Sequence, residues 1–163
     1  MHFHRIKNSI FTLTVSVLGA TLGLAACASS AAGPAQAELP KIEIQLEATR
    51  VIAEVANTDT SRQIGMMNRE SLGKDDGMLF VFKRSETQCM WMKNTLIDLD
   101  VAFADESGKI LNVAQMKAGT ADIHCSKGNA KLALEMNLNW FARRGLGEGH
   151  VMRVPESTLQ AHQ

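Results

Sequence analysis

Residues 89–95, with the sequence CMWMKNT, bring many reactive and polar side chains into one short segment. A thiol, two thioethers, an indole, an ammonium, an amide and a hydroxyl all occur within it. We interpret the segment as a β-strand, in which consecutive side chains point to opposite faces. Alternation would place Cys89, Trp91, Lys93 and Thr95 on one face, and Met90, Met92 and Asn94 on the other.

The face that carries Trp91 suggests a ligand-binding surface. An indole beside an ammonium suits a carbohydrate, a carboxylate or a phosphate group, and Lys93 follows Trp91 on this face. Arg69 could supply a second cation, and the amide of Asn94 could orient a small ligand. The predicted site for a small polar or anionic ligand comprises Arg69, Trp91, Lys93, Asn94 and Thr95.

The same residues also have a purely structural interpretation. Lys93 could form an ion pair with a nearby carboxylate, the candidates being Asp98, Asp100 and Glu135. Asn94 and Thr95 could stabilise a turn by hydrogen bonds from side chain to backbone. In this interpretation the segment supports the fold and binds no ligand.

Two other chemistries can be built from this part of the chain. Met90 and Met92, with His124 nearby, would offer the soft ligands that Cu(I) prefers, although methionine is also a common filler of protein cores. Asp98 and Asp100 would share a strand face, as paired carboxylates in acid–base catalysis do. A hydrolase-type site would draw on Lys93, Asn94, Asp100 and Glu135. Because no triad of Ser or Cys with His and Asp is evident, we favour a non-enzymatic role and assign no catalytic residue, metal ligand or cofactor.

The amino-terminal region has the parts of an export signal. Arg5 and Lys7 form a short basic start, and residues 10–26 form an apolar run without a charge. The run is too short to be a comfortable bilayer span. The four residues LAAC that end at Cys27 resemble the lipobox of bacterial lipoproteins, which implies cleavage before Cys27 and lipid attachment to its thiol. The alternative is an ordinary secretory signal cleaved after Ala37.

Export determines what we expect of the location and of the cysteines. The Ala that follows Cys27 implies, by the sorting pattern of lipoproteins, an outer-membrane protein that faces the periplasm. The membrane would be a partner through the lipid. With Cys27 lipidated, Cys89 and Cys125 remain as an even pair in an oxidising compartment, which predicts a disulfide between them. A free, reactive thiol at Cys89 is the alternative.

Composition and patterning favour one small β domain. The chain has 163 residues and a formal net charge of zero, which argues against non-specific nucleic-acid binding. The predicted strands cover residues 41–47, 50–57, 77–83, 96–105, 109–116, 131–137 and 150–154, and the predicted short helices cover residues 62–69 and 137–145. Because strand follows strand without regular helical crossovers, we predict a mainly β, antiparallel domain of the sandwich or barrel type.

Three sequence blocks resemble one protein family. The blocks are RQIGMMNRESLGKDDGMLFVF, CMWMKNTLIDLDVAFADESGKILNV and LALEMNLNWFARRGLGEG, within residues 50–154. They are similar to the domain of unknown function family 192, a bacterial and archaeal family without an established biochemical role. The resemblance implies a mainly β, sandwich-like fold. Asp98 replaces the Pro that is usual in the family, so a catalytic pair built on Asp98 would be peculiar to this chain.

These observations divide the chain into four parts: a lipoprotein signal peptide (residues 1–26), the lipidated Cys27 with a flexible tether (27–40), one β domain (41–155) and a polar tail (156–163). We predict an exported envelope lipoprotein that acts as a binding or accessory module. Its expected partners are the membrane and an unidentified small ligand or envelope component.

Overall fold

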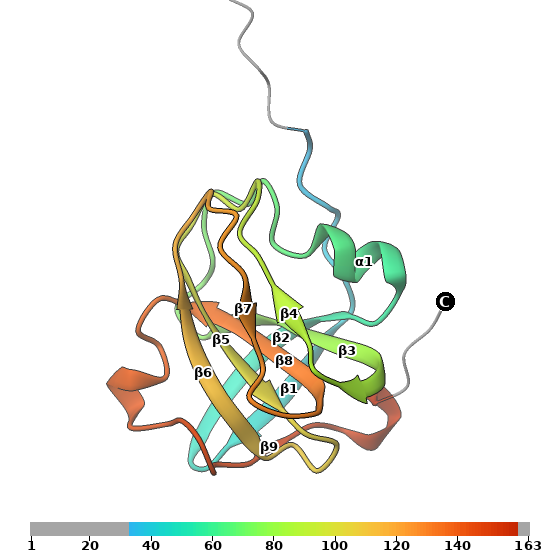
Figure 1. Ribbon diagram of the computed structural model, residues 1–163, viewed down its shortest axis with the longest axis vertical. Helices are drawn as coiled ribbons and strands as arrows, with labels where there is room; N and C mark the ends of the chain where they lie inside the picture. Colours follow the sequence, from blue (N-terminus) through green and yellow to red (C-terminus); the bar gives the residue numbers. More distant parts are fainter. Residues whose placement is uncertain (1–32, 160–163) are drawn as a thin grey trace, which may run out of the picture. The chain divides into compact units, whose positions relative to one another are not determined.

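The computed structural model describes residues 33–159, so the predicted signal peptide, the lipidation site at Cys27 and the end of the polar tail lie outside the described residues (Figure 1). The described part contains one seven-stranded sheet, in the order β6-β5-β8-β3-β2-β1-β9, and a separate pair of short strands, β4 and β7. The large sheet curls (Figure 1), which confirms the prediction of a mainly β, barrel-like domain.

The strands are β1 (Lys41–Leu46), β2 (Thr49–Ala56), β3 (Asp76–Glu86), β4 (Cys89–Met90), β5 (Leu99–Ala104), β6 (Ile110–Met116), β7 (His124–Cys125), β8 (Ala130–Asn137) and β9 (Met152–Arg153). The helical elements are α1 (Asp59–Ile64) and two 3₁₀ turns, η1 (Ala142–Arg144) and η2 (Glu156–Thr158). Each long strand lies within a few residues of a predicted one, because each carries its own apolar pattern. The helix predicted over 137–145 is reduced to η1.

The connection from β2 to β3 departs from the antiparallel prediction. These two strands pair in parallel, and α1 forms the crossover between them. Thr58 caps the helix: its hydroxyl accepts a hydrogen bond from the Ser61 N–H at 3.0 Å, and the Ser61 hydroxyl accepts one from the Thr58 N–H at 3.0 Å. Gly65 ends the helix with a φ of 51°, a value that suits glycine. The helix predicted over 62–69 is therefore wrong in position, because the cap starts it earlier and Gly65 stops it.

The central strands carry apolar side chains on both faces of the sheet. Leu132, Leu134 and Met136 of β8 point to one face and join the larger core cluster. Ala133 and Glu135 alternate with them and point to the opposite face. That opposite face, which we call the methionine-rich face, holds Ala56, Met66, Met78, Phe80, Met92, Leu99, Val101, Phe103, Met116, Ala130 and Ala133. The α1 end and the β4–β7 pair cover it, because Met66 and Met90 pack there.

The last strand brings the two edges of the sheet together. At one edge, β9 pairs with β1. At the other edge, Val151 forms a β-bridge with Lys109, and the Ile110 N–H donates to the His150 carbonyl at 2.8 Å. The chain around β9 therefore ties β1 to the start of β6, which gives the sheet its half-closed form.

The described residues before β1 lie against the domain. The Gln36 amide donates to the Gly65 carbonyl at 2.6 Å, and the Leu39 N–H donates to a Glu54 carboxylate oxygen at 2.8 Å. Leu39 also packs against the methionine-rich face. The end of the segment predicted to be a tether is thus in contact with the domain. In the part of the chain from residue 33 to residue 159, no helix is long and apolar enough to cross a bilayer.

Candidate functional site

The CMWMKNT segment is a strand for only two residues. Cys89 and Met90 form β4, which pairs with β7. The chain then turns at residues 93–94, where Asn94 has a φ of 61°, a left-handed value that Asn tolerates. The strand predicted over 89–95 is therefore wrong beyond Met90, because a turn replaces the expected alternation of faces.

The predicted ligand-binding residues of this segment do not form one row. Trp91 is 51% exposed, and the Lys93 ammonium lies 5.7 Å from the centroid of its ring. Thr95 is buried, and its N–H donates to the Met92 carbonyl at 3.0 Å across the turn. Asn94 is exposed within the turn. The structure thus brings Trp91 and Lys93 together and turns Thr95 inward.

Arg69, the remaining predicted ligand-binding residue, has a different partner. Its guanidinium contacts both carboxylate oxygens of Glu54, at 2.6 and 2.7 Å, and both side chains are largely buried. Burial by itself would raise the pKa of Glu54, but the hydrogen bonds from Arg69 and the Leu39 N–H, with the nearby positive charges, hold that pKa below its usual value. A buried two-point pair of this kind supports the fold. Arg69 therefore does not converge with Lys93 on a common ligand.

Cys89 and Cys125 form the predicted disulfide, which joins β4 to β7 across a sequence separation of 36 residues. Both cysteines are exposed. Two hydrogen bonds support the same junction: the Ser126 N–H donates to the Gln88 carbonyl at 2.8 Å, and the Gln88 N–H donates to the Ser126 hydroxyl at 3.0 Å. Cys89 is thus a cross-link that holds the segment carrying Trp91, and a free thiol is not available there.

A cavity of about 130 Å³ lies between the end of α1 and the β4 segment, on the methionine-rich face. Apolar and sulfur-containing side chains make much of its wall: Met66, Met67, Phe80, Phe82, Met90 and Trp91. Thr95 and Glu135 are the buried polar side chains among the described lining residues. A cavity of about 150 Å³ holds a benzene molecule, so this one can accept a small ligand.

Glu135 lines this cavity from the sheet. It lies opposite Met78 of β3 and Val101 of β5, so both of its lateral neighbours are apolar. Its side chain is 3% exposed, and among the described residues its Oε2 has no hydrogen-bond partner. Burial without a compensating partner raises the pKa of Glu135 to about 8. The carboxyl group is therefore mostly protonated at neutral pH and can donate a hydrogen bond.

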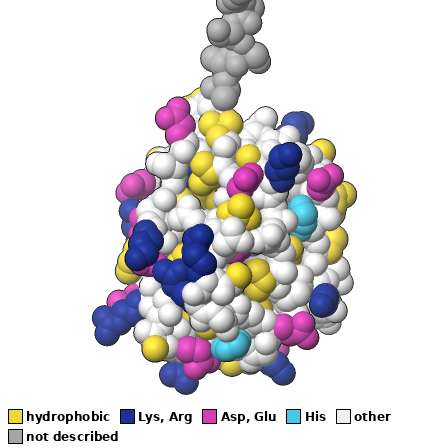
Figure 2. Space-filling model, turned by 90° about the vertical axis from the view of Figure 1, so that its left-hand side faces the viewer, with side chains coloured by type: hydrophobic (Ala, Val, Ile, Leu, Met, Phe, Trp, Pro, Cys, Tyr) yellow, Lys and Arg dark blue, Asp and Glu magenta, His cyan; other side chains and the backbone are white. Residues whose placement is uncertain are grey.

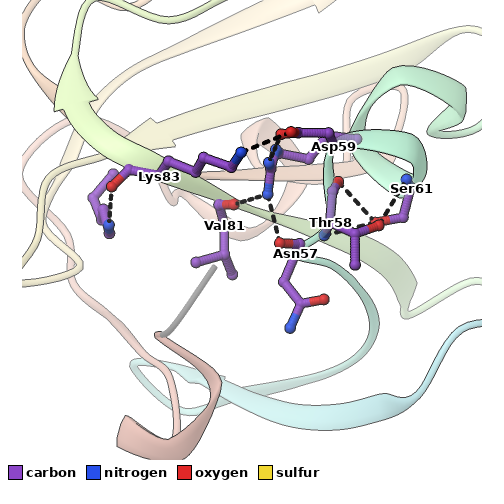
Figure 3. Close-up of polar contacts among 8 residues, drawn as sticks. Asn57, Thr58, Asp59, Ser61, Val81 and Lys83 are labelled. Atoms are coloured by element: carbon purple, nitrogen blue, oxygen red, sulfur yellow. Dashed lines mark hydrogen bonds and ion pairs between the residues drawn. The ribbon is translucent and has the colours of Figure 1, made fainter. Parts of the chain in front are cut away.

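Arg62 is the other charged residue of the described cavity wall, and its guanidinium is already engaged. It donates to the backbone carbonyls of Asn57 at 2.6 Å and Val81 at 2.8 Å (Figure 3). It also pairs with Asp59, which accepts from the Lys83 ammonium at 2.7 Å. The hydrogen bonds from Lys83 and Arg62 hold the pKa of Asp59 below its usual value. The lining residues that the structure describes therefore include no unpaired cation for an anionic ligand.

The predicted hydrolase-type cluster does not assemble. Asp100 and Glu135 point to opposite faces of the sheet, because Asp100 pairs with Met136, the neighbour of Glu135. Burial raises the pKa of Asp100, and backbone N–H groups of the turn before η1 offset part of this effect. Asp98 is exposed and accepts from the Ala118 N–H at 2.7 Å. Neither the Asp98–Asp100 pair nor the larger cluster forms one site.

The proposed Cu(I) ligands lie in different surroundings. Met92 is fully buried in the core, whereas Met90 lines the cavity and lies opposite His124 across the β4–β7 pair. Within residues 33–159, no three His, Cys, Asp or Glu side chains are grouped so as to hold a metal ion. The sulfur atoms that share the cavity wall are those of Met66, Met67 and Met90, and Met92 is not among its lining residues.

The molecular surface is mixed in charge on the face shown in Figure 2. Several Lys and Arg side chains gather in one small group on this face and the others are scattered among Asp and Glu, while hydrophobic side chains form small, separate areas. This distribution agrees with the formal net charge of zero. The face seen in Figure 2 carries no continuous basic stripe of the kind that follows a nucleic-acid backbone.

Known proteins share this sequence pattern and fold. The family model DUF192, described as Uncharacterized ACR, matches residues 41–154. The chain belongs to this family. A solved structure described as a "putative transcription regulator", from Sinorhizobium meliloti 1021, is 28% identical with a TM-score of 0.69, over 72% of this chain and 96% of that chain. A protein of unknown function from Novosphingobium aromaticivorans DSM 12444 is 27% identical with a TM-score of 0.69, over 83% and 100%. No curated protein matches the sequence.

Within this DUF192 domain, the position of Glu135 in the wall of the cavity was not predicted from the sequence. Its signal was an acid in the middle of the apolar strand KLALEMN. From the sequence, Glu135 is expected only as an ion-pair partner for Lys93 or as a member of the hydrolase-type cluster. The cavity around it is built from segments 62–67, 80–82 and 89–95, which are far apart in the chain. The cavity beside Glu135 forms only when these segments come together in the folded domain.

Proposed function

We propose that this DUF192 protein is a non-enzymatic binding module whose small ligand occupies the cavity between α1 and the β4 segment. The observation that carries the proposal is the buried Glu135 carboxyl group, whose Oε2 has no hydrogen-bond partner among residues 33–159 and which lines a cavity with a partly apolar wall. Leaving a buried polar group unsatisfied costs about 1–3 kcal/mol. Buried polar groups normally have hydrogen-bond partners. A buried polar group that lacks one and faces a cavity therefore points to a ligand that supplies the hydrogen bond.

This proposal keeps the predicted binding role but moves the site. Trp91 lines the cavity and is half exposed, so it can close over a ligand while contacting solvent. Lys93 lies over the Trp91 ring, and Arg69 is committed to Glu54. The description of the Sinorhizobium structure does not lead us to propose nucleic-acid binding, because this chain has no net positive charge.

Methionine methyl groups offer a direct test of the proposed binding site. In the purified protein, labelled with ¹³C at the methionine methyls, a panel of benzene-sized compounds should shift the signals of Met66, Met67 and Met90. Met136 and Met152 belong to the opposite core cluster and serve as internal controls, so their signals should stay in place. If no compound shifts the signals of the cavity methionines, or if all methionines shift alike, the binding proposal is wrong.

We also propose that the protein is exported and held at the envelope by a lipid on Cys27. The support is the LAAC motif after the apolar run, together with a disulfide of the kind that persists in an oxidising compartment. In cells, Cys27→Ala should abolish the incorporation of labelled palmitate and move the protein from the outer-membrane fraction to the soluble periplasmic fraction. An unchanged distribution of this variant would contradict the proposal.

A further inference from the structure

We infer that the ligand of this cavity is an uncharged molecule with a benzene-sized apolar body and one hydrogen-bond acceptor, and that the Glu135 carboxyl group donates a hydrogen bond to that acceptor. The inference rests on the proposed function, since it names the ligand class for the same cavity.

The polarity of the cavity wall favours one polar contact on an otherwise apolar ligand. Glu135 is flanked across the strands by Met78 and Val101, neither of which can form a hydrogen bond of ordinary strength with it. Around it, the cavity presents phenylalanine and methionine side chains and the indole of Trp91, and the other polar side chains of the wall are those of Arg62, Gln63 and Thr95. A ligand therefore gains most by burying an apolar body against these side chains and meeting the single carboxyl group.

The charges around the cavity disfavour an ionic ligand of either sign. A cation would meet the Arg62 guanidinium in the wall and the Lys93 ammonium over Trp91. An anion would find Arg62 already bound by Asp59 and two backbone carbonyls. An ion that leaves water for a cavity without an available counter-charge pays a desolvation cost of several kcal/mol.

The protonation state of Glu135 agrees with a donor role. Because burial raises the pKa of Glu135 to about 8, the donor is present at neutral pH and is lost as the pH rises further. The other titratable groups near the cavity are His124, opposite Met90 on β7, and Glu54, which lies in the same row beyond Met78 and is neutralised by Arg69. Affinity for an acceptor ligand should therefore fall as the pH rises through the Glu135 pKa, by about tenfold in total if the hydrogen bond has the strength expected below.

Four matched probes separate the ligand classes. Acetophenone carries an acceptor, cumene has the same apolar size without one, benzylammonium is a cation and benzoate is an anion. Titrations of the purified, disulfide-bonded protein, followed at the Met66, Met67 and Met90 methyl signals, would give each Kd. We expect acetophenone to bind about tenfold more tightly than cumene at pH 6.5, which is about the net worth of one hydrogen bond.

Two substitutions assign this preference to Glu135. Glu135→Gln keeps a donor of nearly the same shape but does not titrate, so it should retain the preference and lose its dependence on pH between 7 and 9. Glu135→Met removes the donor, and acetophenone and cumene should then bind about equally. The methionine methyl spectrum of each variant also reports whether that variant is folded.

Each other result overturns either the ligand class or the site itself. Equal affinity for acetophenone and cumene in the unmodified protein, or a preference that survives Glu135→Met, overturns the inference. Preferential binding of benzylammonium or benzoate to the cavity methionines overturns the ligand class while leaving the proposed binding function in place. If none of the four probes shifts the signals of these methionines, the inference and the proposed site both fail.

Discussion

Glu54 and Glu135 lie in one row across the methionine-rich face, with Met78 between them, yet among residues 33–159 Glu54 is paired with Arg69 whereas Oε2 of Glu135 has no partner. Arg69 holds Glu54 as a carboxylate, whereas Glu135 remains mostly protonated in the wall of the cavity at neutral pH. Glu54 thus helps to hold the fold together, whereas the role that we propose for Glu135 is to donate a hydrogen bond to a ligand.

Replacing Glu135 should change how stability depends on pH. The folded protein keeps the Glu135 proton up to a pKa of about 8, whereas the unfolded chain releases it near the ordinary glutamate pKa of 4.5. Between these values unfolding releases a proton, so the free energy of unfolding of the unmodified protein falls as the pH rises. Each unit of pKa difference corresponds to about 1.4 kcal/mol, so the total loss is several kcal/mol.

Glu135→Gln should therefore flatten the pH profile between pH 5 and pH 8 and leave the variant more stable than the unmodified protein at pH 8. Urea denaturation at pH 5, 6.5 and 8 measures this difference. Parallel profiles for the two proteins would show that Glu135 is ionised or solvated in the folded state.

Removing Arg69 should destabilise the domain strongly. Arg69→Ala leaves the Glu54 carboxylate buried without its partner, and breaking a buried pair in this way costs about 3–5 kcal/mol. Arg50→Ala is a matched control, because Arg50 forms an ion pair with Glu43 on the exposed surface and should cost less than about 1 kcal/mol. Urea denaturation of both variants gives the comparison, and similar losses would argue against a special role for the buried pair.

The disulfide should contribute stability and hold the cavity together. It closes a loop with a sequence separation of 36 residues, for which the chain-entropy model gives about 3–4 kcal/mol. The double variant Cys89→Ser, Cys125→Ser should lose this amount in guanidinium denaturation and bind acetophenone more weakly, because β4 carries part of the cavity wall. Thiol counting on the unmodified protein tests the bond itself, since two reactive thiols at these positions would contradict it.

Lys93→Ala should have only a small effect on both stability and binding. The ammonium contacts the Trp91 ring on the surface, and such an exposed cation–π contact is worth about 0.5–1 kcal/mol. Binding of the uncharged acetophenone should remain within about twofold, because Lys93 is not among the lining residues of the cavity. Loss of acetophenone binding in this variant would show that Lys93 belongs to the binding site. Loss of folding would show that Lys93 is needed for the structure.

Several features were predictable because they depend on local sequence. The alternation of apolar and polar residues in 41–47 and the continuous apolar run in 77–83 predicted β1 and β3, since a strand repeats every two residues or is buried on both faces. The disulfide was expected from the predicted export signal, because it would leave Cys89 and Cys125 as a pair in an oxidising compartment. The family resemblance rested on blocks that match residues 41–154.

Other features depend on contacts between distant parts of the chain. A turn at residues 93–94 overrode the alternation of the CMWMKNT segment, and pairing with β7 limited the strand to Cys89 and Met90. The sequence around Arg69 gave no indication that its guanidinium would form an ion pair with Glu54. Burial decided the state of Glu135, because an acid keeps its proton only where the surrounding chain excludes water and offers no partner. The sequence alone therefore determined the β architecture and the cross-link, and the tertiary structure decided which polar side chains pair with one another and which one lies in the wall of a cavity.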